Sequence, residues 1–131
     1  MGLAEKRMAA SLRDERIPYY QGYLDGDLGF TIQLEVDLSS MENDLAAMQY
    51  VYNQGLDNLY YMLKYIGYDQ IGKDALKEQI KTARMVNIPV GEKKHFELKD
   101  GILTVYEPHA DENANHKYSY SELQKLVEEL L

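Results

Sequence analysis

The fold of this chain is decided by residues 39–68, SSMENDLAAMQYVYNQGLDNLYYMLKYIGY. The apolar residues of this stretch recur mostly at steps of three or four, the spacing of one face of an α-helix. They are Met41, Leu45, Met48, Tyr52, Leu59, Leu63 and Ile66. Ser39 and Glu42 fit a capping box at the start, and Gly67 is typical of the residue that follows a helix end. The pattern predicts a central helix of about 26 residues, about 39 Å long.

A shorter helix is predicted in front of this stretch, over residues 3–16. Its thin apolar stripe consists of Ala4, Met8 and Leu12. Because Pro18 disfavours helical backbone at Ile17, the helix is expected to end or kink there. At most a short second helical turn begins at Pro18.

Residues 30–38 alternate strictly between apolar and polar side chains, which predicts a strand with one buried face. Its apolar positions are Phe30, Ile32, Leu34, Val36 and Leu38. The pattern does not specify where this strand joins the sheet.

Two further elements are predicted after the long helix. Residues 69–83 are typical of a helix with Leu76, Ile80 and Ala83 on one side, and residues 85–90 of a strand. The residues of this strand that face one way are Val86, Ile88 and Val90. Pro89 cannot donate a ladder hydrogen bond, so the strand lies at an edge or ends there.

Asp100 and Gly101 favour a type I′ turn between two strands. A two-residue turn fixes the strand register and places Lys99 opposite Ile102. The pairs expected beyond it are Leu98–Leu103, Glu97–Thr104, Phe96–Val105 and His95–Tyr106. Phe96, Leu98, Leu103 and Val105 then share one face, as a hairpin on a core requires.

A second capping box, Ser119 to Glu122, opens a C-terminal helix. Together, these elements predict a two-layer α+β fold with a small antiparallel sheet of three or four strands. One face of the sheet is packed by the long central helix and by shorter helices, in the order α-β-α-α-β-β-β-α. The length of 131 residues fits one domain, 1–131.

The charge of the chain excludes several partners. Its 14 basic and 22 acidic residues give a net charge of −8. This balance provides no basic footprint for nucleic acid and disfavours an anionic membrane surface. No apolar run approaches the length of a membrane span, and the first residues contain no apolar h-region, so a cytoplasmic location is expected. The absence of cysteine excludes disulfides and thiolate chemistry.

The polar face of the predicted sheet is one candidate site. Glu35 and Asp37 share a side of their strand, about 6.6 Å apart. If this strand pairs near the hairpin, His95, Glu97 and Tyr106 stand on the same face. Two carboxylates, a histidine and a tyrosine are the groups of acid–base chemistry or of a small-ligand site. An uncovered antiparallel sheet gives the same pattern.

A metal site is the second candidate, in the loop where His109 and His116 flank Asp111 and Glu112. Their spacing matches neither a helical nor a zinc-knuckle pattern, so a solvated loop is the preferred interpretation and no metal is expected. A calcium loop starting at Asp25 is excluded, because its twelfth position is not glutamate.

Tyrosine is the one unusual count, at 12 residues. Seven of these rings fall in two short windows, and they are Tyr19, Tyr20, Tyr23, Tyr60, Tyr61, Tyr65 and Tyr68. Seven rings exceed what one core stripe absorbs, which predicts a half-exposed surface for a partner or for self-association. Packing at helix edges in a monomer explains them equally well.

The motifs of phosphate-binding loops, zinc proteases, nucleophile elbows and dinucleotide folds are all missing. No cofactor is expected, and the sequence favours a non-catalytic protein while leaving catalysis open. Its leading interpretation is a small acidic interaction module, acting through protein contacts or as a homodimer. The alternative is a small-ligand binder or hydrolase on the polar sheet face, at Glu35, Asp37, His95 and Tyr106.

Overall fold

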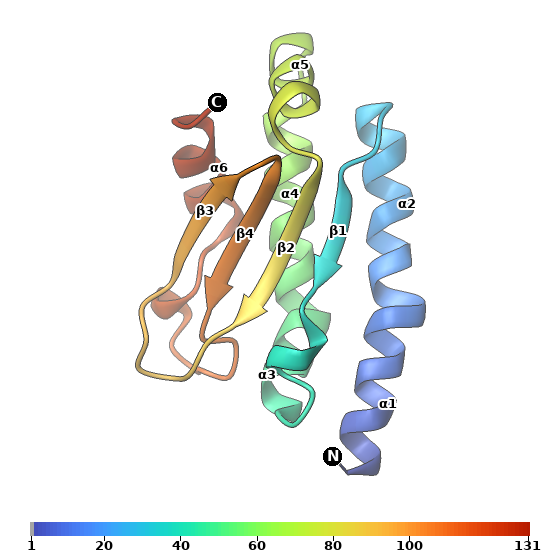
Figure 1. The fold of residues 1–131 in the computed structure, drawn as a ribbon, viewed down its shortest axis with the longest axis vertical. Coiled ribbons are helices and arrows are strands. Elements are labelled where there is room, and N and C mark those ends of the chain that lie inside the picture. Colours follow the sequence, from blue (N-terminus) through green and yellow to red (C-terminus); the bar gives the residue numbers. More distant parts are fainter. Residues whose placement is uncertain (1) are drawn as a thin grey trace.

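A computed structural model describes residues 2–131 of the chain, and residue 1 lies outside them. It has two layers, with helices on one face of a four-stranded sheet (Figure 1). The helices are α1 (Leu3–Ser11), α2 (Ile17–Leu28), α3 (Leu45–Tyr50), α4 (Leu56–Ile66), α5 (Gln70–Gln79) and α6 (Tyr120–Glu128). The strands are β1 (Gln33–Val36), β2 (Thr82–Asn87), β3 (His95–Lys99) and β4 (Ile102–Glu107). The two-layer α+β fold and the predicted order of elements are confirmed.

The N-terminal helix continues through Pro18, so the predicted end or kink at Ile17 is wrong. A π-helical turn, Leu12–Arg16, connects α1 to α2 and widens the helix just before the proline. Ile17 keeps helical dihedral angles and donates to the carbonyl of Leu12, five residues back. The missing N–H of Pro18 falls next to this irregular turn, where the regular hydrogen-bond ladder is already interrupted. Gly29, with φ of 79°, ends α2 in the left-handed conformation.

The central helix begins at Leu45, six residues after the predicted cap. Asp44 is the N-cap and accepts a hydrogen bond of 3.1 Å from the backbone nitrogen of Ala47. Ser39 lies instead in a short 3-10 turn, Leu38–Ser40, so the capping box proposed there is wrong. A second π-helical turn, Val51–Gly55, joins α3 to α4 without a break. The helix ends at Gly67 as predicted.

The strand order is β1-β2-β4-β3, and only β3 and β4 pair antiparallel. β1 pairs parallel with β2, and β2 parallel with β4, so the predicted antiparallel sheet is wrong for two of the three pairings. The reason is the crossover: α3 and α4 carry the chain back along the sheet, and β2 therefore runs in the direction of β1 (Figure 1). β4 then inserts between β2 and β3.

The hairpin is confirmed residue by residue. Asp100 and Gly101 both have positive φ, 54° and 79°, as a type I′ turn requires. All five predicted pairs, from Lys99–Ile102 to His95–Tyr106, are present.

The prediction for residues 69–90 is only partly correct. α5 ends at Gln79, so Ala83 belongs to β2 and not to the helix. The buried side chains of β2 are Ala83 and Met85, which is the opposite face from Val86 and Ile88. β2 is a central strand that ends at Asn87, two residues before Pro89.

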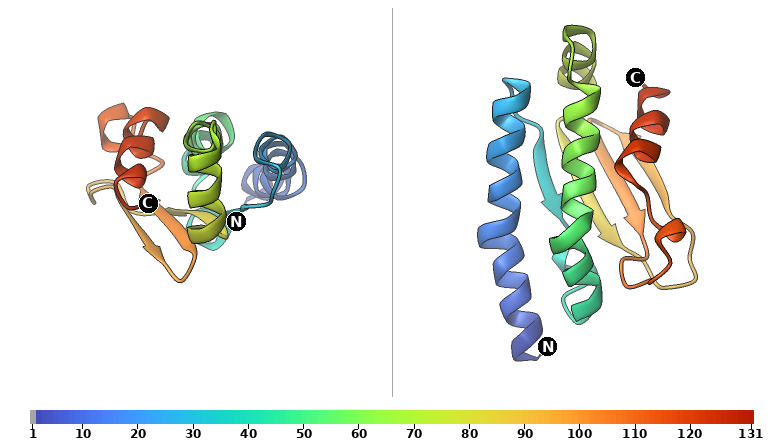
Figure 2. Two further views of the ribbon diagram at one scale, coloured as in Figure 1. Left: turned by 90° about the horizontal axis from the view of Figure 1, so that it is seen from above. Right: turned by 180° about the vertical axis from the view of Figure 1, so that it is seen from behind.

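The helices leave the other face of the sheet uncovered. Seen from above and from behind, α2, α4 and α6 lie side by side on one face, with α4 in the middle (Figure 2). The core lies between these layers, and its largest fully buried side chains include Leu12, Leu24, Ile32, Met48, Leu56, Met62, Leu63, Leu76 and Met85. In α6, Ser119 caps the helix as predicted, but the Glu122 carboxylate binds Lys94 and does not complete the capping box.

Candidate functional site

The polar sheet face does not bring its four predicted residues together. Glu35 lies on β1 and His95 on β3, the two opposite edges of the sheet. Three strand spacings separate them, about 14 Å at roughly 4.8 Å each. Glu35 is instead paired with Arg84 of β2, with 2.9 Å between Nη2 and Oε2.

The other members of that set make local contacts. Asp37 accepts a hydrogen bond of 2.5 Å from the Ser39 hydroxyl. His95 stacks on Tyr106, with 4.5 Å between ring centroids, and the Tyr106 hydroxyl donates to Glu97 at 3.2 Å. No helix of residues 2–131 covers the face that carries them (Figure 1). Glu35 and Asp37 line an open cleft of about 570 Å³ at the β1 edge, and His95 and Tyr106 are not part of it.

The predicted loop histidines separate in the structure. His116 is exposed, and its Nδ1 lies at hydrogen-bond distance, 2.7 Å, from Asp111 Oδ2. His109 is buried on the inner side of the loop, 1% exposed. In residues 2–131, no group of three or more histidine, aspartate or glutamate side chains has the arrangement of a metal site.

The two tyrosine windows meet across a groove between α2 and α4. We call it the tyrosine groove, with a volume of about 570 Å³. It is lined by Arg16, Tyr19, Tyr20, Tyr23, Asp27, Asp57, Tyr60, Tyr61 and Lys64. Five of the seven predicted tyrosines therefore share one site, although they come from segments about 40 residues apart in sequence.

Each of two tyrosines in the groove donates its hydroxyl to a carboxylate of the facing helix. Tyr20 on α2 binds Asp57 on α4 at 2.8 Å, and Tyr60 on α4 binds Asp27 on α2. Tyr20 and Tyr60 are buried, 5% and 6% exposed, and their rings lie 5.5 Å apart. Burial, and then the adjacent carboxylate, raises the pKa of both hydroxyls well above the ordinary value. The two reciprocal bonds fix the floor of the groove.

Cations of the chain itself already contact these rings. The Arg16 guanidinium lies 5.3 Å from the Tyr19 centroid and 5.1 Å from the Tyr20 centroid. Lys64 Nζ lies 5.8 Å and 5.7 Å from the centroids of Tyr60 and Tyr61. Both contacts are within the range of cation–π attraction. The groove is therefore built to hold positive charge against aromatic faces.

The outer rings extend this surface toward α6. Tyr61 stacks on Tyr65 at 5.7 Å, and both rings contact Tyr120 of α6. Tyr19, Tyr23 and Tyr65 are exposed, at 51%, 56% and 37%. Tyr68 is the exception among the predicted residues, because it does not line the groove and is exposed near Ile71 at the start of α5.

The sequence analysis did not include the charged members of the groove. They are Arg16, Asp27, Asp57 and Lys64. Helical spacing was the available signal, since Arg16 and Tyr20, and likewise Tyr23 and Asp27, are four residues apart and lie on one face. The pairing of these two faces across the helices has no local sequence signal.

Comparison of this chain with protein-family models, with curated proteins and with solved structures gave no match. The function is therefore argued from the site alone. No helix within residues 2–131 has both the length and the apolar character that crossing a bilayer requires.

Proposed function

We propose that this chain is a non-catalytic protein-interaction module, and that the tyrosine groove binds a lysine- or arginine-rich segment of a partner protein. The observation that carries the proposal is the convergence of five tyrosines and two aspartates on one groove between α2 and α4. Tyrosine gives a large contact area at low entropic cost, and it is enriched in binding surfaces.

A basic occupant follows from the chemistry of the groove. The rings of Tyr19, Tyr20 and Tyr60 already attract the chain's own arginine and lysine. The net charge of −8 adds a long-range attraction for a basic segment. Exposed Tyr23 and half-buried Tyr61 have ring surface that a partner's cation can contact.

A second copy of this chain is the competing occupant. Two copies repel each other through their like net charge, which favours a basic partner over a homodimer. The homodimer and the cytoplasmic location, both expected from the sequence, remain proposals. Sedimentation of the pure protein tests the homodimer. If the protein forms a concentration-dependent dimer and the double variant Tyr61→Ser with Tyr65→Ser does not, the groove binds a second copy of this chain and not a basic partner.

The alternative of a ligand binder or hydrolase on the polar sheet face has less support. Glu35 and His95 lie on the two opposite edge strands of the sheet and Tyr106 on β4 between them, on a face where water competes with polar contacts.

Calorimetric titration with a short lysine-rich peptide tests the proposal. Tyr19→Ser combined with Tyr23→Ser removes two exposed rings. Tyr19 packs edge-on against buried Tyr20 at 5.2 Å, but Tyr20 keeps its own core contacts, so folding should be retained. We expect this variant to bind about five- to tenfold more weakly, as loss of cation–π contacts of roughly 1 kcal/mol predicts.

Tyr68→Ser is the matched control, because Tyr68 is also an exposed tyrosine but lies outside the groove, in the turn between α4 and α5. It should leave the affinity unchanged. Equal losses in both variants, or binding of a glutamate-rich peptide with the same affinity, would contradict the proposal.

A further inference from the structure

A second cleft, of about 640 Å³, lies between the central helix and residues 109–119. The helical wall includes Gln49, Tyr50, Asn53 and Asn58, and the loop wall includes Lys117 and Ser119. The volume is that of a small-molecule site. We call it the carboxamide cleft, after the four amide side chains of its helical wall, Gln49, Asn53, Gln54 and Asn58.

Three ionisable side chains are buried near this cleft: His109 and Lys117 line it, and Glu107 lies next to His109. Glu107, His109 and Lys117 are 3%, 1% and 6% exposed. Glu107 accepts a hydrogen bond of 2.6 Å from the backbone nitrogen of Tyr118. Lys117 donates to the carbonyl oxygen of Asp111, and its ammonium lies 4.5 Å from the centroid of Tyr50. Glu107 and Lys117 are therefore each satisfied by groups of the chain.

His109 is the exception. Its ring stacks on Tyr50, with 5.7 Å between centroids, and its Nε2 lies 3.4 Å from Glu107 Oε1. This contact lacks hydrogen-bond geometry, and neither ring nitrogen has a hydrogen-bond partner in the described part of the chain. His109 lines the cleft. An unpaired buried polar atom costs free energy, which a ligand hydroxyl that reached the ring would recover.

The charges around the cleft do not favour an ionic ligand. The Lys117 ammonium is used by Asp111 and Tyr50, and the Asp111 carboxylate is used by His116 and by the backbone nitrogen of Asn113. An anion would also be repelled by the nearby carboxylate of Glu107, which lies 3.4 Å from His109 Nε2. The remaining polar groups are amides and hydroxyls, each of which donates and accepts hydrogen bonds.

We propose that the carboxamide cleft binds a small uncharged molecule rich in hydroxyl groups, of the size of a sugar. Hydroxyl groups match the donor–acceptor character of the exposed amide side chains of Gln49, Asn53 and Gln54. This site is separate from the tyrosine groove and gives the chain a second binding activity beyond protein contacts.

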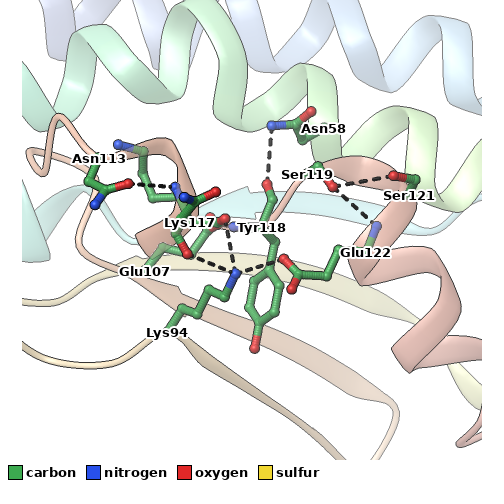
Figure 3. A network of polar contacts seen from close by, with 10 residues as sticks. Asn58, Lys94, Glu107, Asn113, Lys117, Tyr118, Ser119, Ser121 and Glu122 are labelled. Carbon is green, nitrogen blue, oxygen red and sulfur yellow. Dashed lines mark hydrogen bonds and ion pairs between the residues drawn. The ribbon is translucent and has the colours of Figure 1, made fainter.

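The loop wall of the cleft is held in place from behind by Lys94 (Figure 3). Its Nζ donates to the carbonyl oxygens of Asn115 and Lys117, each at 3.2 Å, and to the Glu122 carboxylate at 2.7 Å. Asn58 donates to the Tyr118 carbonyl at 3.3 Å and joins the two walls. The cleft is thus preformed, which lowers the entropic cost of binding a ligand.

Amide NMR titrations with glucose, N-acetylglucosamine and inositol test the proposal. We expect at least one of them to shift the backbone amide resonances of Asn53, Asn58 and Ser119. The same compound should shift the His109 ring nitrogens in a long-range ¹⁵N spectrum. His109→Phe keeps a ring that stacks on Tyr50 but removes both nitrogens, and it should weaken binding about tenfold. His95→Phe is the matched control, because His95 also stacks on a tyrosine, Tyr106, but lies on the open sheet face. It should leave affinity unchanged.

Asn53→Ala gives an independent test, because Asn53 is exposed and its loss does not disturb the core. It should weaken binding severalfold, while Asn43→Ala, an exposed asparagine outside the cleft, should not. The proposal is overturned if none of the three compounds shifts these residues. It is equally overturned if inorganic phosphate or spermidine shifts them more strongly than any sugar does.

Discussion

Arg16 Nε donates a hydrogen bond of 3.0 Å to the carbonyl oxygen of Tyr52. Arg16 ends the π-helical turn between α1 and α2, and Tyr52 lies in the π-helical turn between α3 and α4. The two irregular turns of the two longest helical segments are thus joined directly. The same guanidinium stacks on Tyr19, Tyr20 and Tyr52 at the end of the tyrosine groove. Irregular turns of this kind often mark functional sites, and here they meet at the proposed binding groove.

Arg16→Lys should destabilise the protein by about 1–2 kcal/mol, because lysine lacks the Nε donor and the planar group that stacks on three rings. Urea unfolding measures this loss. Arg13→Lys is the control, since Arg13 is exposed and pairs only with the neighbouring Asp14. Equal stability of the two variants would show that the Arg16–Tyr52 bond contributes nothing.

Stability should fall at alkaline pH. Burial is the main cause that raises the pKa of Tyr20, Tyr50 and Tyr60 above the ordinary value of 10.0. The unfolded chain therefore loses these protons first, and their stabilising contribution is complete below about pH 10 and decreases above it. The tyrosinate absorbance of the folded protein should show that some tyrosines ionise only well above pH 10. Tyr60→Phe should reduce the amplitude of this late phase. A single titration of all tyrosines near pH 10 with the fold intact would contradict this.

Two glycine substitutions should act in opposite directions. A Cβ at Gly72 would collide with the carbonyl oxygen of Ile66, so Gly72→Ala should destabilise the protein by about 2 kcal/mol or more. A Cβ at Gly22, in α2, meets nothing within 4 Å. Gly22→Ala should therefore stabilise by about 0.5–1 kcal/mol through the reduced entropy of the unfolded chain. Thermal unfolding of both variants measures the signs, and a shared sign would contradict the packing described.

Gln21 protects the outer edge of β1. Its amide nitrogen donates to the Ile32 carbonyl at 2.9 Å, and its oxygen accepts from the Leu34 nitrogen at 2.8 Å. The Gln21 side chain thus binds the backbone donor and acceptor with which a neighbouring strand would otherwise pair. Gln21→Ala should cost about 1–2 kcal/mol and promote self-association through the uncovered edge, as light scattering measures. The Gln21 amide also donates to the Asp25 carboxylate at 3.0 Å. Gln21→Glu keeps the bond from Leu34 but places a carboxylate against Asp25 and the Ile32 carbonyl, so it should destabilise the protein at least as much as alanine; a milder effect of glutamate would contradict this.

Lys64 occupies the aromatic faces that a partner's cation would use. Lys64→Gln should therefore tighten the binding of a lysine-rich peptide about two- to fivefold, because it removes both competition and repulsion. Calorimetry measures this gain. Lys77→Gln, on the exposed side of α5, changes the net charge equally and serves as control. Weaker binding by the Lys64 variant would show that the cation does not enter between these rings.

The parts of the fold that depend on local residues were predictable. Asp100 and Gly101 determined the hairpin and all five pairs, because a two-residue turn leaves no freedom of register. The parallel pairings could not be predicted, because the position of β1 in the sheet depends on where the long helix returns the chain. The continuous helix at Pro18 depends on a π-helical turn, which the sequence does not signal.

The tyrosine groove was predictable only in part. The two windows of tyrosines predicted exposed aromatic surface, but the pairing of Tyr20 with Asp57 and of Tyr60 with Asp27 depends on how α2 packs on α4. The carboxamide cleft was missed, although a signal existed. Leu103 and Val105 face the core, and the same alternation places Glu107 and His109 on the inner side.

The most direct test of the groove as the binding surface is an amide NMR titration of the protein with a lysine-rich peptide. We predict shifts confined to α2 and α4, centred on Tyr19, Tyr23, Tyr60 and Tyr61, with the sheet strands unchanged. Shifts distributed over the acidic surface, or concentrated on Glu35 and Asp37 of the open sheet face, would show that the tyrosine groove is not where a basic partner binds.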